Sequence, residues 1–370
     1  MKKKSILLIG NSGLKHSGAD GQTTKVRLYC KKIVDEGFNL LFVDLESFRR
    51  RPFSTLFKIK KYIKICDRIV LITAERGSKI LLPYIDFINR KYKKPFIFPL
   101  VGISVLHFAI GRLNDDDKKR FFEEKAYVLG KKDKKMVKEL LRIDCIMPET
   151  PLLSDVYKEF YGLTNVLTLS NFRDDSILSH KKRFSDGQIR LIYLSRVTKT
   201  KGIFDLLETV IDINAKELIV TLDIYGECSL NDEEKKEFAR LTNMPNIVYH
   251  GPINNKDVVN TIAKYDLFVF PTIYYGEGMP GVIAESLISG TPILSSRFMQ
   301  APFLLENNKN SIFFEIGNKN DLKEKLLYII NNKTILDDMS KNALKTGKKF
   351  TYRHVKSVFL KYVCGEDNKE

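Results

Sequence analysis

The sequence predicts an α/β protein built from two parallel-sheet domains that face a central cleft. Short apolar runs alternate with amphipathic or polar helical stretches along nearly the whole chain. A single polar stretch, residues 171–188, interrupts this alternation, and 370 residues are enough for two domains with separate cores. Because parallel sheets bind ligands at the carboxyl ends of their strands, we expect the site in the cleft between the two domains.

The apolar runs predict the strands in chain order. In the first half they are Ile6–Gly10, Leu40–Asp44, Ile69–Ile72, Phe96–Val101, Cys145–Met147 and Val166–Leu169. In the second half they are Ile189–Leu194, Leu218–Tyr225, Ile247–Tyr249, Leu267–Phe270, Ile293–Ser295 and Ile312–Phe314. The last helices are expected at 333–349 and 352–363. We therefore predict Rossmann-like domains over residues 1–170 and 171–350, with a terminal helix over 351–370 that returns to the first domain.

The composition is that of a soluble globular protein, with 44% hydrophobic and 29% charged residues. Five cysteines show no Cys-x-x-Cys pair and no metal-ligand spacing with histidine, so we expect reduced, mostly buried thiols. The apolar run after Lys2–Lys4 is too short for a signal peptide. The longest uncharged run, Phe96–Gly111, falls short of the roughly 20 apolar residues of a membrane span. A cytoplasmic location is expected.

The positive charge lies almost entirely in the first half. Residues 1–170 hold 34 Lys and Arg against 19 Asp and Glu, whereas residues 171–370 hold 28 against 26. This asymmetry indicates a polyanionic partner for the first half, either nucleic acid or an anionic membrane surface. The chain has no zinc-finger spacing, RNA-recognition signature or arginine-rich tail, which argues against nucleic acid.

Residues 49–65 concentrate this basic charge. Three arginines, Arg49–Arg51, precede a run in which apolar residues alternate with lysines. The apolar residues are Leu56, Phe57, Ile59, Tyr62 and Ile63, and the lysines are Lys58, Lys60, Lys61 and Lys64. The pattern is typical of an amphipathic helix that lies on anionic lipid. It is equally typical of a surface helix whose lysine stems cover its own core face.

A second informative segment is Gly276–Glu285. Pro280 favours a helix start, so we expect Glu277 in a loop and Glu285 on a helix that runs to Gly290. The first amides of this helix, at Gly281 and Val282, can bind an anion. Glu285 leans over Gly281, where the missing side chain leaves space for a ligand. Taken alone, the two acids are better explained as part of an ordinary solvated loop and helix.

A basic turn follows the strand that ends at Leu194. It carries Arg196 and Lys201-Gly202 before a helix that opens near Ile203. A guanidinium fork and a mobile ammonium group together suit a diphosphate, although a solvated basic turn would look the same in isolation. In the first half, the strand ending at Gly10 is followed by glycine-rich sequence that leads into a helix. Gly21 is the best candidate there to let backbone amides approach a phosphate or sugar, or else it is a plain helix cap.

Taken in order, these motifs resemble those of the retaining glycosyltransferases of family 4, which have the two-domain GT-B fold. The resemblance covers nearly the whole chain. It rests on Arg196…Lys201-Gly202, Ile224–Glu227, Asn246–Gly251, Ala263–Thr272 and the pair Glu277 and Glu285. Cys228 stands where the family usually has the second glycine of a Gly-x-Gly turn.

The resemblance implies a role for each matching residue. Arg196 and Lys201 would bind the donor diphosphate, Glu277 the hydroxyls of the transferred sugar, and Glu285 the ribose hydroxyls. The remaining donor-site positions would be Gly21, Gly226, Gly251, Ile253, Gly278, Met279, Pro280, Gly281 and Val282. Neutralising the departing diphosphate lowers the barrier to transfer, so neither a metal nor a cofactor is expected.

Two features bear on the catalytic assignment. Many relatives have a histidine directly after the fourth strand, whereas this chain has Val101–Ser104 and only later His107, which is more often a packed histidine than a catalytic one. Asp115–Asp117 formally contains Asp-x-Asp, a metal signature of a different glycosyltransferase fold. We interpret it as a helix cap.

The resemblance implies transfer from a nucleotide diphosphate sugar, by family frequency a UDP-sugar, with GDP left open. The acceptor would be a saccharide or a polyprenyl-diphosphate-linked saccharide of bacterial capsule, exopolysaccharide or lipopolysaccharide synthesis. Lipid-linked acceptors favour peripheral membrane association through the basic first domain. The alternatives are a nucleotide-sugar epimerase or hydrolase on the same scaffold, since fold does not determine reaction, and a nucleic-acid-binding protein.

Overall fold

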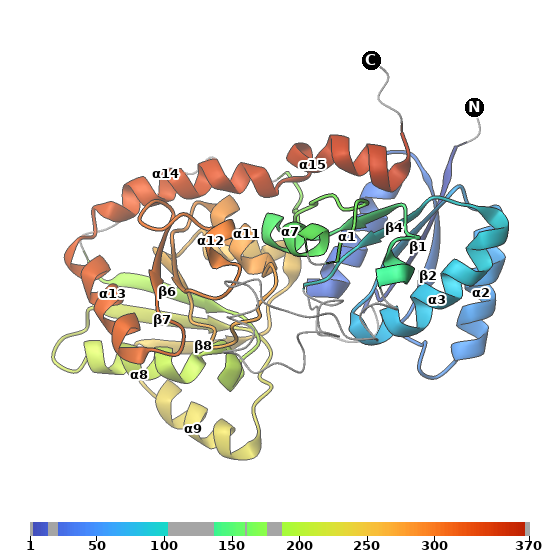
Figure 1. The fold of residues 1–370 in the computed structure, drawn as a ribbon. Helices are drawn as coiled ribbons and strands as arrows, with labels where there is room; N and C mark the ends of the chain where they lie inside the picture. The colour runs from blue at the N-terminus through green and yellow to red at the C-terminus, as the bar shows by residue number, and fades with distance from the viewer. Residues whose placement is uncertain (1–2, 14–20, 103–136, 160, 176–186, 367–370) are drawn as a thin grey trace. The chain divides into compact units, whose positions relative to one another are not determined.

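The computed structural model describes residues 3–13, 21–102, 137–159, 161–175 and 187–366 (Figure 1). The chain divides into two compact units. Unit 1 comprises residues 1–171 together with 355–370, and unit 2 comprises residues 172–354. Each unit contains one parallel sheet, which confirms the predicted α/β class.

Unit 1 is built on a five-stranded sheet in the order β2-β1-β3-β4-β5. Its strands are β1 Ser5–Gly10, β2 Asn39–Asp44, β3 Arg68–Ile72, β4 Phe96–Pro99 and β5 Cys145–Met147. Its helices are α1 Gly21–Asp35, α2 Pro52–Ile65, α3 Glu75–Tyr92 and α7 Pro151–Glu159. The strands are short and almost wholly apolar because helices cover both faces of a parallel sheet.

The last residues of the chain complete unit 1. Helix α15, Tyr352–Val358, runs into a π-helical turn, Phe359–Cys364. There the ring of Phe359 packs edge-on against Tyr29 of α1, with centroids 5.1 Å apart. The Arg68 guanidinium also donates to the carbonyl of Tyr362 at 2.6 Å. These contacts explain why the terminal segment belongs to unit 1.

Unit 2 is built on a six-stranded parallel sheet in the order β11-β10-β9-β6-β7-β8. Its strands are β6 Ile189–Leu194, β7 Val220–Tyr225, β8 Ile247–Gly251, β9 Leu267–Phe270, β10 Ile293–Ser296 and β11 Ser311–Phe314. The chain builds outward from β6 in one direction and then restarts at β9 on its other side. This reversal is the topological switch point at which doubly wound sheets bind their ligands.

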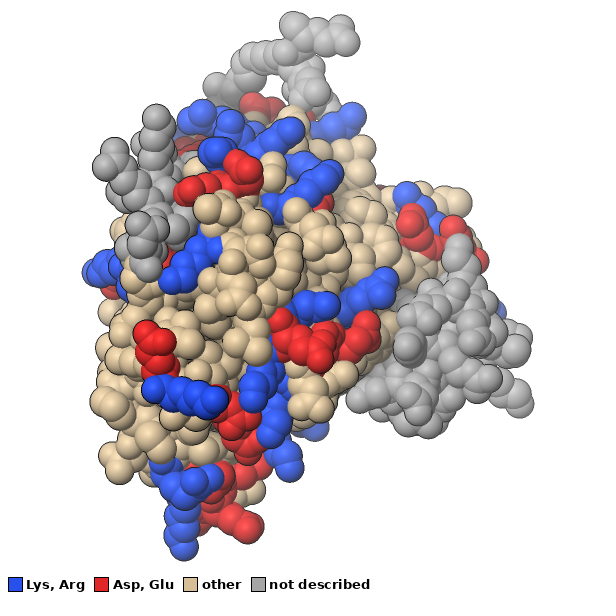
Figure 2. Space-filling model, turned by 90° about the vertical axis from the view of Figure 1, so that its left-hand side faces the viewer, with Lys and Arg blue, Asp and Glu red and all other residues tan. Residues whose placement is uncertain are grey.

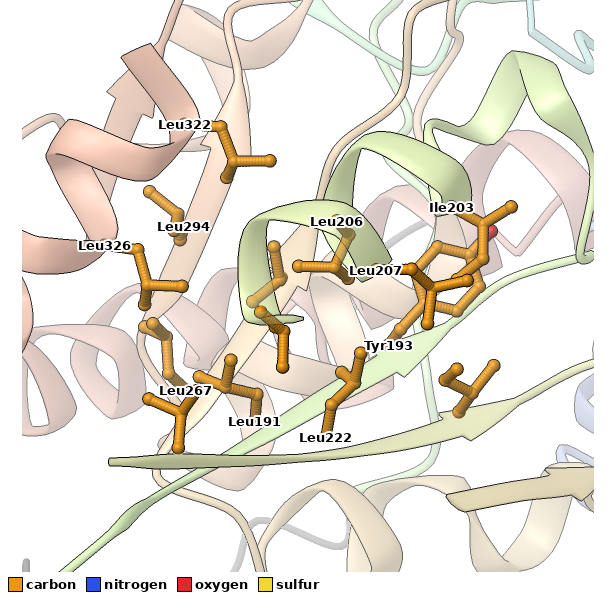
Figure 3. Close-up of a cluster of buried hydrophobic side chains, with 14 of the residues drawn as sticks. Leu191, Tyr193, Ile203, Leu206, Leu207, Leu222, Leu267, Leu294, Leu322 and Leu326 are labelled. Carbon is orange, nitrogen blue, oxygen red and sulfur yellow. The ribbon is translucent and has the colours of Figure 1, made fainter. Parts of the chain in front are cut away.

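Helices cover both faces of the unit 2 sheet. On one face lie α8 Ile203–Ile213, α9 Asp232–Thr242 and α13 Lys319–Asn331, around the leucine-rich core that Figure 3 shows. The second core lies under α10 Val258–Ile262, α11 Gly281–Ser289 and α12 Ala301–Leu304. Helix α14, Ile335–Gly347, contributes to both cores and packs against α11.

The surface of unit 2 carries both signs of charge. On the side where α8, α13 and α14 lie in Figure 1, Lys and Arg are interspersed with Asp and Glu (Figure 2). Ion pairs join α13 to α8, among them Lys319 with Glu208 at 2.6 Å and Lys323 with Asp212 at 3.2 Å. This mixture agrees with the nearly balanced charge of residues 171–370.

The structure differs from the predicted elements at several boundaries. The run Val166–Leu169 is not a strand, because only Val166 forms an isolated bridge, to Ile146. The strand expected from Leu218 begins at Val220. The helix expected from Pro280 begins at Gly281, with Pro280 at its N-cap in an extended conformation. Proline fits both positions because a fixed φ near −65° is compatible with each.

Candidate active site

The switch point of unit 2 brings together two loops that lie far apart in the sequence. The loop after β6 carries Lys201 and the loop after β9 carries Glu277, 76 residues later. The Lys201 ammonium group pairs with Oε1 of Glu277, and the hydroxyl of Thr272 donates to the same oxygen at 3.0 Å. The two charged side chains are only 17% and 10% exposed. A partly buried cation and a partly buried carboxylate therefore meet at the carboxyl ends of adjacent strands.

Gly202 makes this close approach of the two loops possible. It ends the 3₁₀ turn Lys199–Lys201 with φ of 71°, in the left-handed region that glycine adopts without strain. A Cβ at this position would overlap the carbonyl oxygen of Pro271 at the end of β9. Next to it, the Ile273 amide donates to the Thr200 carbonyl at 3.0 Å. The glycine of the Lys-Gly pair thus has a steric role that the sequence pattern alone does not reveal.

Arg196 lies at the mouth of the same loop. Its carbonyl accepts a 2.9 Å hydrogen bond from the buried hydroxyl of Tyr193, which holds the turn in place. Burial, with a further contribution from the Glu277 charge, raises the pKa of Tyr193, so this hydroxyl stays a donor at physiological pH. The Arg196 side chain is exposed, and its guanidinium has no hydrogen bond within the described ranges. It is therefore available to an anionic ligand.

The N-terminus of α11 lies directly after the acidic loop. The carbonyl of Glu277 accepts from Nε2 of Gln300 at 3.1 Å, which anchors the loop from α12. In the first turn of α11, the amides of Gly281 and Val282 have no intrahelical acceptor, and the helix dipole adds partial positive charge. Gly278 and Met279 link the acidic loop to this turn. The arrangement favours an anion at this end of the helix.

The space predicted beside Gly281 is not empty, which corrects that expectation. The Arg173 guanidinium fills it, and a Cβ on Gly281 would overlap this group. Arg173 Nε donates to Oε1 of Glu285 at 2.7 Å, and the two side chains are 16% and 11% exposed. The missing side chain of Gly281 therefore admits an arginine from the start of unit 2, which lies 112 residues before its partner Glu285.

Gly226 and Gly251 lie at the ends of β7 and β8. The Gly226 amide donates to the Gly251 carbonyl at 2.8 Å, and a Cβ on Gly226 would overlap the carbonyl oxygen of Ser195 after β6. Ile253 packs against the core beneath α11. On the same strands, the His250 ring stacks on Tyr225 with centroids 4.5 Å apart and pairs with Asp223. The loops after β6, β7 and β8 therefore meet at the same edge of the sheet as Lys201.

Three of the predicted features are not tested by the site in unit 2. Gly21 is the first residue of α1 in unit 1, with open space where a Cβ would be. His107 and the Asp115–Asp117 segment are outside the described residues. Their assigned roles stay predictions.

Sequence reasoning missed several residues that the structure adds to the site. Thr272 and Gln300 hold Glu277, and Arg173 holds Glu285. Thr272 could have been suspected because it directly follows Pro271 at the end of a strand. Arg173 has no such signal, because its partner is distant in sequence and its surroundings read as a polar linker.

A doubly wound sheet with a cationic loop and an acidic loop at its switch point defines a nucleotide-binding α/β domain. With the second parallel sheet, the chain has the GT-B fold. Residues 174–346, which lie within unit 2, match the family model described as "Glycosyl transferases group 1". Unit 2 is therefore similar to this glycosyltransferase family.

Comparison with known proteins agrees with this assignment. The chain is 23% identical over 308 residues to the poly(ribitol-phosphate) alpha-N-acetylglucosaminyltransferase of Staphylococcus aureus, covering 83% of this chain and 57% of the relative. It is 25% identical over 189 residues to the S. aureus capsular polysaccharide biosynthesis glycosyltransferase CapM, covering 50% and 48%. The chain thus spans about half the length of these curated relatives.

A solved structure shares the fold across the whole chain. Anabaena HepE, crystallised with UDP and glucose, superimposes with a TM-score of 0.70 at 13% identity. The match covers 98% of this chain and 100% of HepE.

Proposed function

We propose that the protein transfers a sugar from a nucleotide diphosphate sugar to a saccharide acceptor, with retention of the anomeric configuration. The observation that carries this proposal is the meeting of Lys201 and Glu277 at the switch point, beside the N-terminus of α11. A diphosphate needs cations and amide donors, whereas a sugar needs hydrogen-bond acceptors for its hydroxyls. Lys201 and the first amides of α11 provide the donors, and Glu277 provides the acceptor, in the partly buried site at the switch point.

The charges suit the departure of a nucleoside diphosphate. When the glycosidic bond breaks, negative charge grows on the leaving phosphate. Preorganised cations and amides that face this charge lower the barrier. Lys201, Arg196 and the first amides of α11 would supply that stabilisation, and Glu277 would orient the sugar through its hydroxyls. We therefore expect turnover to persist in EDTA, since the protein's own cations face the diphosphate.

The relatives support a donor and an acceptor class. HepE was crystallised with UDP, which supports a UDP-sugar as donor. The two staphylococcal relatives are named for a poly(ribitol-phosphate) acceptor and for capsular polysaccharide. We propose an acceptor from bacterial surface-polymer synthesis, either a saccharide or a polyprenyl-diphosphate-linked saccharide.

We further propose that α2 brings unit 1 to an anionic membrane surface. Phe53 and Phe57 lie one turn apart on this helix and are 85% and 70% exposed. Exposed lysines surround them, at Lys58, Lys60, Lys61 and Lys64. Aromatic rings among cations fit the interface of an anionic bilayer. No helix in the described ranges combines the length and apolarity that crossing a bilayer requires.

The activity test measures release of nucleoside diphosphate. Purified protein is incubated with UDP-glucose, UDP-N-acetylglucosamine or GDP-mannose, with and without poly(ribitol phosphate) or a polyprenyl-diphosphate saccharide. We expect one donor to release diphosphate only when an acceptor is present, and NMR of the product to show the donor's anomeric configuration. Release without an acceptor would indicate a hydrolase, and a changed sugar on intact donor would indicate an epimerase. Thermal stabilisation by neither UDP nor GDP would contradict donor binding altogether.

A further inference from the structure

Arg173 occupies an unusual position beside Glu285. Its fork of donors is divided between two acceptors, with Nε donating to Oε1 of Glu285 at 2.7 Å and Nη1 donating to the carbonyl of Phe172 at 3.0 Å. The guanidinium therefore contacts the carboxylate through one oxygen only. A bidentate pair would have used both oxygens. Within the described ranges, Oε2 of Glu285 has no hydrogen bond.

The backbone of Arg173 is also held firmly. Its amide donates to the carbonyl of Phe350 at 2.8 Å, and its carbonyl accepts from the amide of Tyr352 at 2.8 Å. This pairing forms a short parallel bridge between Arg173 and Thr351. The side chain then extends over Gly281, the residue whose missing Cβ leaves room for it. Backbone, glycine and carbonyl together restrict the guanidinium to one orientation.

We propose that Arg173 is a positioning residue that aims Oε2 of Glu285 at the ribose of the bound nucleotide. This inference rests on the proposed function, in which Glu285 binds the ribose hydroxyls. A charge-assisted hydrogen bond at one oxygen narrows the rotation of the carboxylate, so its other oxygen keeps a preferred direction and retains its lone pairs for hydroxyl donors. The positive charge also offsets the repulsion between Glu285 and a diphosphate at the start of α11.

Removal of the Arg173 guanidinium should weaken the contacts of the protein with the ribose hydroxyls of the nucleotide and leave its other contacts unchanged. Binding of UDP and GDP, and of their 2′,3′-dideoxy counterparts, is measured by calorimetry on the wild-type protein and on Arg173→Met. We expect Arg173→Met to weaken binding of the ribose nucleotide about tenfold, roughly the worth of one charge-assisted hydrogen bond. Binding of the dideoxy nucleotide should change less than about twofold. The Arg173→Met variant would then bind the ribose nucleotide and its dideoxy counterpart with almost equal affinity.

Matched variants separate this role from a structural one. Glu285→Gln should lower the same discrimination, and the double variant should lose little more, because the two residues act as one unit. Arg173→Lys, which keeps the charge without the fork, should restore discrimination only in part. Equal loss of ribose and dideoxy binding in Arg173→Met would overturn the proposal, as would unchanged or tighter ribose binding. If the wild-type protein binds neither UDP nor GDP, the proposed function fails first and this inference fails with it.

Discussion

At the scale of single residues, Lys201 and Glu277 neutralise each other's charge. Their ion pair is shielded from solvent, and the Lys201 ammonium group also lies 5.8 Å from the centroid of the Phe270 ring. A diphosphate that approaches this place would compete with Glu277 for the ammonium group. Replacing Lys201 and replacing Glu277 should therefore change the affinity for a diphosphate in opposite directions.

We predict that Lys201→Met and Glu277→Gln separate binding from turnover. Lys201→Met should weaken UDP binding about tenfold and also lower turnover, because it removes a cation that faces the phosphates. Glu277→Gln should leave UDP binding equal or tighter, because it removes a negative charge. It should still lower turnover about 100-fold or more through lost contacts with the sugar. Calorimetry with UDP and initial rates with the donor sugar provide the two measurements.

The matched control for this pair is Lys199→Met in the same 3₁₀ turn, where the lysine is exposed. It should leave both quantities within about twofold. Thermal unfolding of each variant checks that the fold is retained. Weaker UDP binding in Glu277→Gln would contradict the competition between the carboxylate and the diphosphate.

At the scale of elements, α2 has one face buried in the core and one exposed face with apolar and basic residues. Ile59 and Ile63 are fully buried in the unit 1 core, as expected for a surface helix with a core face. The outward face instead presents Phe53, Phe57 and Ile65 among the lysines. The exposed face of an ordinary surface helix is mostly polar, so two exposed phenylalanines one turn apart are consistent with the proposed contact with a membrane surface.

We predict that α2 binds anionic vesicles in a salt-dependent manner. The protein should sediment with phosphatidylserine-containing vesicles at low ionic strength and be released at about 0.5 M salt, where charges are strongly screened. Replacing Phe53 and Phe57 by serine should lower vesicle binding about tenfold, since each ring loses part of its burial energy. Replacement of Phe303 in unit 2, which is 50% exposed, is the control. Equal binding to anionic and zwitterionic vesicles would contradict binding through the lysines of α2.

At the scale of the whole molecule, buried thiols tie stability to pH. Cys66, Cys145 and Cys364 are buried in unit 1. Burial raises the pKa of Cys66 and Cys145 to about 11 and that of Cys364 to about 12. An unfolded thiol ionises near pH 8.5–9. Between these values the unfolded chain loses protons that the folded chain keeps, so unfolding becomes more favourable as pH rises.

We therefore predict a loss of stability from about pH 9 to about pH 12 that depends on these thiols. Urea unfolding midpoints measured at intervals across this range should fall steadily. A variant with valine or alanine at all three positions should show a shallower decline, because three of the thiols whose pKa is raised by burial are then absent. If the unfolding midpoints of the wild-type protein and the variant fell equally steeply with pH, the role of these thiols would be contradicted. Below pH 9 the thiols should add no pH dependence, since they are protonated in both states.

Much of this architecture was predictable because its signals are local. Apolar runs of three to eight residues predicted every strand in the described part of the chain, and turn residues such as Gly290 marked the ends of helices. The failed strand, Val166–Leu169, has the right residues, but only Val166 pairs with a neighbour. A strand exists only where a partner supplies hydrogen bonds along it, and composition cannot show that.

The sequence by itself therefore determined the two parallel sheets, the loops that carry Arg196, Lys201 and Glu277, and the motifs that resemble those of a glycosyltransferase family. Each depends on residues that are neighbours in the chain. Only the tertiary structure decided that Lys201 pairs with Glu277 and that Arg173 fills the space beside Gly281. Lys201 and Glu277 are 76 positions apart, and Arg173 lies 112 positions before Glu285, the acid that it pairs with. Strand order and packing, rather than local propensity, bring such residues together.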